Sequence, residues 1–305
     1  MDVYLTAPRG FCAGVRRAIA MVEDALFKHG APVYVRHEIV HNKHVIADLE
    51  AKGAVFIEEL NEAPDNRPIV FSAHGVSRDV FNEAQRRGMT VIDATCPLVE
   101  KVHKRIKLFD EAGLEIIVIG KQNHPEIIGT IGQLDKARKV HVIYSIEEAQ
   151  KLDIPDGATV GFVTQTTLSV DDTKEIIACL KQRFPNIQGL DRADICYATT
   201  NRQAAVRELA QATPNIVILG SKNSSNSRHL CESAFKHGAQ NAWLIDDYHE
   251  LDWAEIDKLS SLGISAGASA PEYLVENLLT ELKRRYNNIN IQQIIMAQEN
   301  VNFKL

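Results

Sequence analysis

The sequence predicts an α/β fold in which three similar units pack around a shared axis. Three cysteines, Cys12, Cys96 and Cys196, each stand directly before a segment whose apolar residues recur with helical periodicity. Between these segments lie short runs of Val and Ile bounded by Gly and polar residues, a pattern typical of parallel strands with helices on both faces. The same order of elements follows each cysteine, and such internal similarity indicates repeated structural units.

Each unit contains three predicted strands after its cysteine helix. The first strands are expected at 32–42, 115–126 and 215–226. The second strands, which lead into acidic segments, are expected at 54–64, 139–152 and 241–253. The third strands are expected at 68–80, 159–173 and 262–275, and each runs into a further helix.

The N-terminal segment is expected to complete the third unit. The segments MTVIDATC and NIQGLDRADIC lead from the first two units to the next cysteine, whereas no fourth cysteine follows the third unit. DVYLTAPRGFC at the N-terminus has the matching pattern, so its strand supplies the missing piece. The predicted units are therefore 14–95, 96–193 and 194–286 completed by 1–13, followed by a C-terminal tail at 287–305.

The composition is typical of a cytoplasmic enzyme. The 305 residues carry a formal net charge of −6, and no apolar run approaches the roughly 18 residues that a membrane helix needs. The first residues do not form a signal peptide, and the lack of a basic patch argues against nucleic acid as a partner. The five cysteines are odd in number and not closely spaced, which favours free thiols in a reducing compartment.

The three repeated cysteines are candidate metal ligands. At a junction of strand and helix, unpaired N–H groups and the helix dipole favour the thiolate that binds metal. Cys179 and Cys231 lie within helical periodicity instead, where a small buried side chain is the usual interpretation. A structural zinc site normally has close Cys-x-x-Cys pairs and four protein ligands, and neither is present. Three thiolates suit a four-iron cluster that leaves one iron open to substrate.

A second metal motif lacks the expected setting. The run from His37 to His41 matches the H-E-x-x-H pattern of zinc proteases, which requires both histidines on one helix face. Here the motif continues a predicted strand, with β-branched residues between the histidines. A zinc protease is therefore not expected.

Polar side chains follow the first and third strands of each unit. They are His41, Asn42, His124, Glu126, Ser224, Ser225, Asn226, His74, Thr166, Thr167 and Ser269. Ligands bind outside the carboxyl ends of strands in open α/β sheets, so these loops are expected to line one pocket. These side chains are mostly uncharged hydrogen-bond donors, and such donors at helix N-termini suit a phosphate or diphosphate. The alternative to ligand binding is local helix capping, with a capping box from Ser269 to Glu272 and a helix cap at Ser169.

The motifs PRGFCAG, RHEIVHN, FSAHGV, DATCPLV, NHPE, TQTTLSVDDT, ICYATTNRQ, GSKNSSNS and AGASAP occur in this order. With them, the sequence closely resembles the 4-hydroxy-3-methylbut-2-enyl diphosphate reductase family, which completes the methylerythritol phosphate route to isoprenoids. This resemblance implies a pseudo-threefold trefoil of three α/β domains around one [4Fe-4S] cluster, bound by three cysteines with one open iron site. The implied reaction removes an allylic hydroxyl with two electrons and protons, giving isopentenyl and dimethylallyl diphosphate.

The resemblance also implies roles for individual residues. It assigns the cluster to Cys12, Cys96 and Cys196. It assigns the substrate diphosphate to His41, His74, Ser224, Ser225, Asn226 and Ser269, with His124 beside them. Glu126 would relay protons to the departing hydroxyl, and Thr166 or Thr167 would hold that hydroxyl at the open iron. The implied electron donor is a ferredoxin or flavodoxin, and no dinucleotide motif follows a strand.

Chemical requirements support the same assignment. Breaking a C–O bond needs a Lewis acid, an electron source and a proton donor, and a cluster with an open iron provides the first two. Glu126 is the only acidic side chain in the strand-end loops and is the candidate general acid, although it is also placed to cap the following helix.

Two other functions stay open: a redox-neutral hydro-lyase that needs no external electrons, and a non-enzymatic iron–sulfur sensor.

Overall fold

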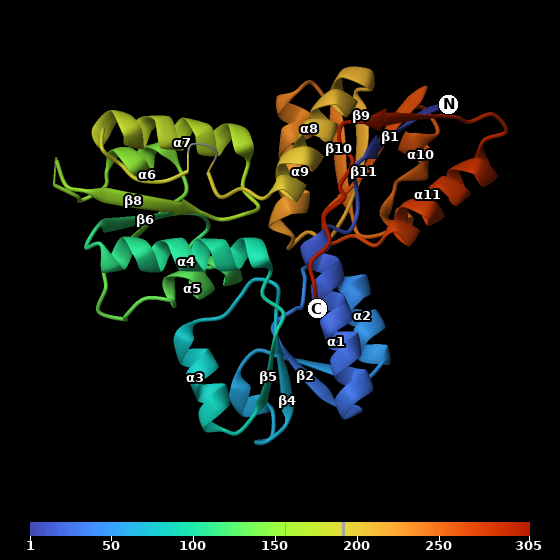
Figure 1. The fold of residues 1–305 in the computed structure, drawn as a ribbon. Helices are drawn as coiled ribbons and strands as arrows, with labels where there is room; N and C mark the ends of the chain where they lie inside the picture. The colour runs from blue at the N-terminus through green and yellow to red at the C-terminus, as the bar shows by residue number, and fades with distance from the viewer. Residues whose placement is uncertain (156, 191–192) are drawn as a thin grey trace. The chain divides into compact units, whose positions relative to one another are not determined.

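The computed structural model describes residues 1–155, 157–190 and 193–305, and within these residues it contains three β-sheets flanked by helices (Figure 1). Every strand pair in the sheets is parallel. The predicted α/β class, with three parallel sheets, is confirmed. Across the described ranges, no helix combines the length and the apolar character that crossing a membrane requires.

The strands of each sheet come from one part of the chain, apart from β1. Sheet A has the order β10-β9-β11-β1-β12, with β1 Asp2–Ala7, β9 Asn215–Leu219, β10 Asn241–Ile245, β11 Ser261–Ala266 and β12 Asn290–Ile295. Sheet B has the order β3-β2-β4-β5, with β2 Val33–Arg36, β3 Ala54–Ile57, β4 Pro68–Phe71 and β5 Thr90–Asp93. Sheet C has the order β7-β6-β8, with β6 Glu115–Ile119, β7 Val140–Ile143 and β8 Val160–Thr164.

The helices repeat in the same order as the strands. The cysteines are followed by α1 Ala13–His29, α4 Pro97–Glu111 and α8 Tyr197–Ala212. The first strands are followed by α2 Lys43–Ala51, α5 Pro125–Ile131 and α9 Ser225–Lys236. The third strands are followed by α3 Arg78–Arg86, α7 Val170–Arg183 and α11 Glu272–Arg285. The second strands are followed by the short helices η1 Leu60–Glu62, α6 Ile146–Gln150, η2 Tyr248–Glu250 and α10 Trp253–Ile256.

The three sheets share one topology. In each, the first strand of the repeat (β2, β6 or β9) lies between the second and the third. β5 then adds to the third strand of sheet B, and β1 adds in the same way to β11 of sheet A. In sheet C, an isolated parallel bridge between Gly161 and Gln188 occupies this place. The N-terminal strand therefore pairs where the sequence pattern predicted it.

The chain forms two compact units. Unit 1 consists of Met1–Arg16, His41–Asp48 and Tyr197–Asn302 and contains sheet A. Unit 2 consists of Arg17–Val40, Leu49–Cys196 and Phe303–Leu305 and contains sheets B and C. The predicted boundaries at 14–95, 96–193 and 194–286 stay a prediction.

Strands β6, β8 and β9 are buried on both faces. All five residues of β8 and of β9 are buried, as are the Ile and Val residues of β6. Continuous apolar runs of this kind are expected where helices cover both sides of a parallel sheet. The carboxyl ends of these strands are thus supported by a rigid core, which positions the loops that follow them.

The segment with the H-E-x-x-H motif is not helical. β2 ends at Arg36, His37 has a φ of 58°, and α2 begins only at Lys43. The predicted first strand is therefore shorter than 32–42, because the backbone turns at His37. The motif lacks the helix on which zinc binding by this pattern depends.

Candidate active site

Each of the three predicted ligand cysteines lies in the turn directly before a helix. α1, α4 and α8 begin one residue after Cys12, Cys96 and Cys196. In all three turns, the cysteine N–H donates to a main-chain carbonyl two residues beyond the end of a third strand. The N···O distances are 3.1 Å from Cys12 to Ala268, 3.0 Å from Cys96 to Ala73 and 3.0 Å from Cys196 to Thr166.

This shared contact gives the three thiols equivalent local surroundings directly before the N-termini of three helices. None of the five cysteines forms a disulfide. Within the described ranges, no group of three or more His, Cys, Asp or Glu side chains is arranged to hold a metal ion. By donor chemistry, however, three thiols in repeated turns fit an iron–sulfur cluster.

Unit 1 gathers polar side chains at the N-terminus of α9. Ser224 caps this helix by accepting the N–H of Ser227, and Ser225 and Asn226 begin its first turn. Asn226 is 3% exposed, and neither its amide oxygen nor its amide nitrogen has a hydrogen-bond partner in the structure. Leaving a buried polar group unpaired costs about 1–3 kcal/mol. Asn226 is therefore suited to a ligand that completes these bonds.

Ser269 contacts the loop that carries His41. The Ser269 hydroxyl donates to the main-chain carbonyl of His41, with an O···O distance of 2.9 Å. The alternative that Ser269 forms a capping box is wrong, because α11 begins at Glu272 and its N-cap, Pro271, makes no side-chain bond. Ser169, in contrast, does cap α7, by accepting the N–H of Asp172. Unit 1 thus brings Ser269 and His41 together.

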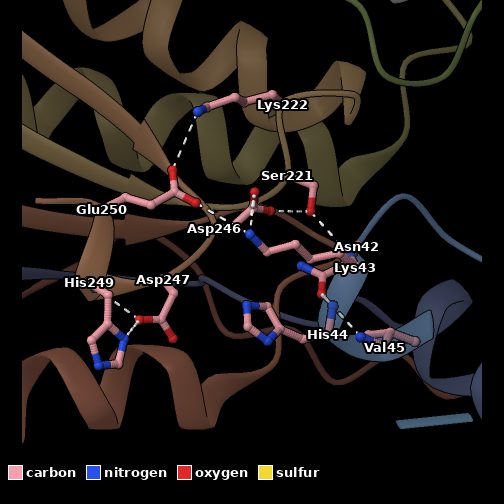
Figure 2. Close-up of polar contacts among 10 residues, drawn as sticks. All are labelled: Asn42, Lys43, His44, Val45, Ser221, Lys222, Asp246, Asp247, His249 and Glu250. Atoms are coloured by element: carbon pink, nitrogen blue, oxygen red, sulfur yellow. Dashed lines mark hydrogen bonds and ion pairs between the residues drawn. The ribbon is translucent and has the colours of Figure 1, made fainter. Parts of the chain in front are cut away.

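Asn42 fixes the chain direction after His41 (Figure 2). Its Oδ1 accepts the N–H of His44 at 3.1 Å and the N–H of Val45 at 3.2 Å, which caps α2. Asn42 is fully buried. The polar residue after His41 therefore has a clear local role in starting the helix.

Lys43 ties the same loop to the ends of β9 and β10 (Figure 2). Its N–H donates to the Ser221 hydroxyl at 3.2 Å, and Ser221 donates to Asp246 at 2.5 Å. The Lys43 ammonium pairs with Asp246 at 3.0 Å and with Glu250 at 3.3 Å. The hydrogen bond to Asp246 raises the pKa of Lys43. The sequence did not suggest these contacts, because the partners look like ordinary surface charges.

Unit 2 holds Glu126 between α5 and the end of β8. His124 caps α5 by accepting the N–H of Glu126 at its Nδ1, at 3.1 Å. One carboxylate oxygen of Glu126 accepts the N–H of Thr166 at 2.6 Å, and the other accepts the Thr166 hydroxyl at 2.9 Å. The Thr166 carbonyl accepts the N–H of Cys196. One threonine therefore connects the candidate acid to a candidate ligand.

Burial raises the pKa of Glu126 to about 7, although both hydrogen bonds from Thr166 favour the carboxylate. The side chain is almost fully buried, so the loss of hydration outweighs these bonds. Because Thr166 engages the carboxylate, Glu126 does not cap α5. A carboxyl with this pKa retains a proton on about half of the molecules at neutral pH, which suits a general acid.

Further predicted residues of unit 2 lie close by. The rings of His74 and His124 meet edge to face, with centroids 5.7 Å apart. The Thr167 hydroxyl accepts the side-chain N–H of Gln165 at 3.0 Å. Unit 2 thus brings the two histidines together on loops that follow β4 and β6, next to the Glu126 and Thr166 pair.

Comparisons with known proteins show the family to which the chain belongs. A family model described as LytB protein matches residues 3–283. The chain belongs to the LytB protein family. It is 50% identical over 305 residues to the 4-hydroxy-3-methylbut-2-enyl diphosphate reductase of Ruegeria pomeroyi, covering 100% of this chain and 96% of the relative. It is 51% identical over 309 residues to the reductase of the same name from Gluconobacter oxydans, covering 100% and 91%.

Solved structures of similar proteins lead to the same family. The E-1-hydroxy-2-methyl-but-2-enyl-4-diphosphate reductase from Plasmodium falciparum matches with a TM-score of 0.95 and 38% identity, covering 100% of this chain and 95% of that chain. The family predicted from the sequence motifs is confirmed.

The predicted site residues of this LytB chain are divided between its two compact units. Unit 1 contains Cys12, His41, Ser224, Ser225, Asn226 and Ser269. Unit 2 contains His74, Cys96, His124, Glu126, Thr166, Thr167 and Cys196. Their roles in binding and catalysis stay predictions.

A residue that sequence reasoning missed lies behind the His74 loop. His103, on α4, lines a cavity of about 310 Å³ in unit 2 together with Thr95 and Gln133. It packs so closely on Gly75 that a Cβ there would lie 2.6 Å from its Cε1 atom. Burial lowers the pKa of His103 to about 4, so it is neutral at physiological pH. His103 therefore supports the turn after His74, and only its apolar neighbours in α4 hinted at burial.

Proposed function

We propose that this chain reductively removes the allylic hydroxyl of 4-hydroxy-3-methylbut-2-enyl diphosphate and releases isopentenyl and dimethylallyl diphosphate. Membership of the LytB family and 50% identity to a reductase of that name support the activity. The observation that carries the proposal is the position of Thr166. It binds the candidate acid Glu126 through its N–H and hydroxyl, and its carbonyl binds the candidate ligand Cys196.

Diphosphate binding begins at α9, where the unpaired Asn226 amide and the helix N-terminus both favour an anion. Ser224 and Ser225 add hydroxyl groups in the same turn. The Ser269 hydroxyl releases the carbonyl of His41 and donates to a phosphate oxygen instead. The full set of diphosphate contacts is His41, His74, His124, Ser224, Ser225, Asn226 and Ser269.

Cys12, Cys96 and Cys196 hold the cofactor as thiolates. When bound, a [4Fe-4S] cluster with one open iron supplies the electrons and a Lewis acid for the substrate oxygen. The equivalent turns support this ligand set, and none of the three cysteines forms a disulfide.

Glu126 supplies the proton that converts the departing hydroxyl to water. Its raised pKa keeps a proton available at neutral pH, and Thr166 fixes both carboxyl oxygens. The Thr167 hydroxyl accepts from Gln165, so its own proton can be donated to the substrate hydroxyl. His124 positions Glu126 by accepting its main-chain N–H. Of the two protons used per turnover, one leaves in this water and the other forms the new C–H bond of the product, and two electrons from the reductant complete the balance.

Electrons reach the enzyme from a reduced ferredoxin or flavodoxin in the cytoplasm. A chain in which none of the five cysteines forms a disulfide is in keeping with a reducing compartment.

The test is an anaerobic assay with reconstituted cluster, reduced methyl viologen and the hydroxylated C5 diphosphate. Viologen oxidation accompanied by both isoprenoid diphosphates is the expected result. Cys96→Ser is expected to lose the cluster and the activity, whereas Cys179→Ser, inside α7, serves as the matched control. Loss or addition of water at the substrate, with neither isoprenoid diphosphate formed and no viologen oxidised, would instead identify a redox-neutral hydro-lyase. No reaction from cluster-loaded protein would leave only a sensor role.

A further inference from the structure

The C-terminal tail follows β1 toward the turn that carries Cys12. β12 pairs with β1 in parallel from Asp2 opposite Asn290 to Ala7 opposite Ile295. The N–H of Met296 then donates to the carbonyl of Ala7 at 2.8 Å. The tail thus accompanies the strand that leads directly into the first cysteine turn, and Figure 1 shows both strands at one edge of sheet A.

Three residues beyond Met296, the tail places Glu299 against Arg202 in the core of unit 1. Arg202 is 1% exposed and Glu299 is 8% exposed, so the pair is buried. The two guanidinium nitrogens Nη1 and Nη2 donate to the two carboxylate oxygens at 2.9 and 3.2 Å. Asn201 donates to the same carboxylate at 3.1 Å. A paired geometry of this kind is among the stronger charged hydrogen bonds in proteins.

The other N–H groups of Arg202 bind main-chain carbonyls, and two of them bind Gly10 in the turn that carries Cys12. Nε and Nη2 donate to the carbonyl of Gly10 at 3.1 and 2.8 Å, and Nη1 donates to the carbonyl of Ala198 at 2.9 Å. All five N–H groups of the guanidinium are therefore used. Gly10 has a φ of 64°, and its own N–H bonds to Ala266 at 3.3 Å. Both polar groups of Gly10, two residues before Cys12, are thus fixed.

A similar arginine contact lies just before each of the other two ligand cysteines. Arg17, on the helix after Cys12, donates to the carbonyl of Thr95 at 3.1 Å, directly before Cys96. Its Nε donates to the carbonyl of Lys304 at 2.7 Å, so the end of the tail also serves this arginine. Arg105, on the helix after Cys96, pairs with Asp194, two residues before Cys196. Each cysteine turn is held by an arginine from a helix that follows another cysteine.

We propose that the C-terminal tail is a positioning element for the cluster cysteines, acting through Glu299 and Arg202 on the turn that carries Cys12. This inference rests on the proposed function for the role of Cys12 as a ligand. Without the carboxylate, Arg202 is a buried cation with no counter-charge and must move toward water or another acceptor. Gly10 then loses its anchor, and the Cys12 turn opens more often than the rest of the unit.

The experiment measures how readily the turn that carries Cys12 opens in the cluster-free chain of 305 residues. The protein is treated with iodoacetamide, and alkylation of the Cys12 and Cys179 peptides is followed by mass spectrometry. Glu299→Gln is expected to speed alkylation of Cys12 by about fivefold or more, because local opening exposes the thiol. Cys179, in α7, is expected to react at an unchanged rate. Glu276→Gln, an exposed acid on α11, is the matched control and is expected to change neither rate.

A second variant separates local opening from misfolding. Arg202→Met with Glu299→Met replaces the buried pair by apolar side chains, which proteins often accept without loss of stability. This double variant is expected to fold and still show fast alkylation of Cys12. Unchanged alkylation of Cys12 in both variants would overturn the proposal, and so would an equal rise at Cys12 and Cys179. Because the readout needs neither cluster nor substrate, its failure is distinct from failure of the reductase activity.

Discussion

Glu126→Gln is expected to remove a pH dependence from the stability of the protein. The carboxyl has an ordinary pKa of 4.5 in the unfolded chain, and burial raises it to about 7 in the fold. Between these two values the unfolded chain has lost the proton while the folded chain keeps it. The folded state therefore binds more protons, and the free energy of unfolding decreases as the pH rises. The decrease is complete above the folded pKa and amounts to about 3 kcal/mol.

The measurement is urea unfolding of the cluster-free chain at pH 5 and pH 8, for the unmodified protein and Glu126→Gln. Other titrating groups are common to both proteins, so the difference between them isolates this carboxyl. We expect the difference in unfolding free energy between the two proteins to change by about 2.5 kcal/mol in favour of the variant between pH 5 and pH 8. Parallel pH profiles would refute the inference that Glu126 is protonated in the fold.

The same substitution tests the catalytic role of Glu126. Gln keeps the shape of the side chain but has no acidic proton, and loss of a general acid typically lowers the rate by about 10²- to 10⁴-fold. In the unmodified enzyme, turnover is expected to decrease as the pH rises through about 7, as the proton is lost. Turnover of Glu126→Gln close to that of the unmodified enzyme would contradict the assignment.

Three further predictions concern the neighbours of these groups. Asn226→Ala is expected to weaken the binding of inorganic diphosphate by about 10- to 100-fold in calorimetry, because hydrogen bonds to a charged ligand are lost. Thr166→Val removes a bond that favours the carboxylate, so the pH at which activity decreases is expected to rise by about one unit in rate profiles. Gly75→Ala is expected to cost about 2–4 kcal/mol in chemical unfolding, because φ is 80° and the new Cβ would meet His103.

The turns and sheets that the sequence predicted correctly depend on local signals. Cys96 precedes a proline that begins α4, and His124 precedes a proline that begins α5, so both turns could be located from the chain itself. The alternation of Val and Ile runs with helical periodicity was enough to predict parallel sheets. The pairing of β1 with β11 followed from the repeat, because one unit lacked a strand that the others had.

The parts that the sequence did not reveal depend on contacts between distant residues. Arg202 and Glu299 are 97 residues apart, and nothing near either residue indicates that both are buried. Lys43 and Asp246 look equally ordinary until the fold brings them together. The sequence of the tail does not predict β12 either, because this strand is mostly exposed and has no apolar face to mark it as a strand.

The pairing of β1 with strands made much later has a consequence for biosynthesis. Thr6, in β1, is hydrogen-bonded to partners on β11 that lie 258 and 259 residues further along the chain. At about 5–20 residues per second, the ribosome adds these partners on the order of 13 to 52 s after β1. Glu299 follows later still. Cys12 is the first of the three cysteines to leave the ribosome, yet its turn gains the support of Arg202 and Glu299 only after Glu299 has been added.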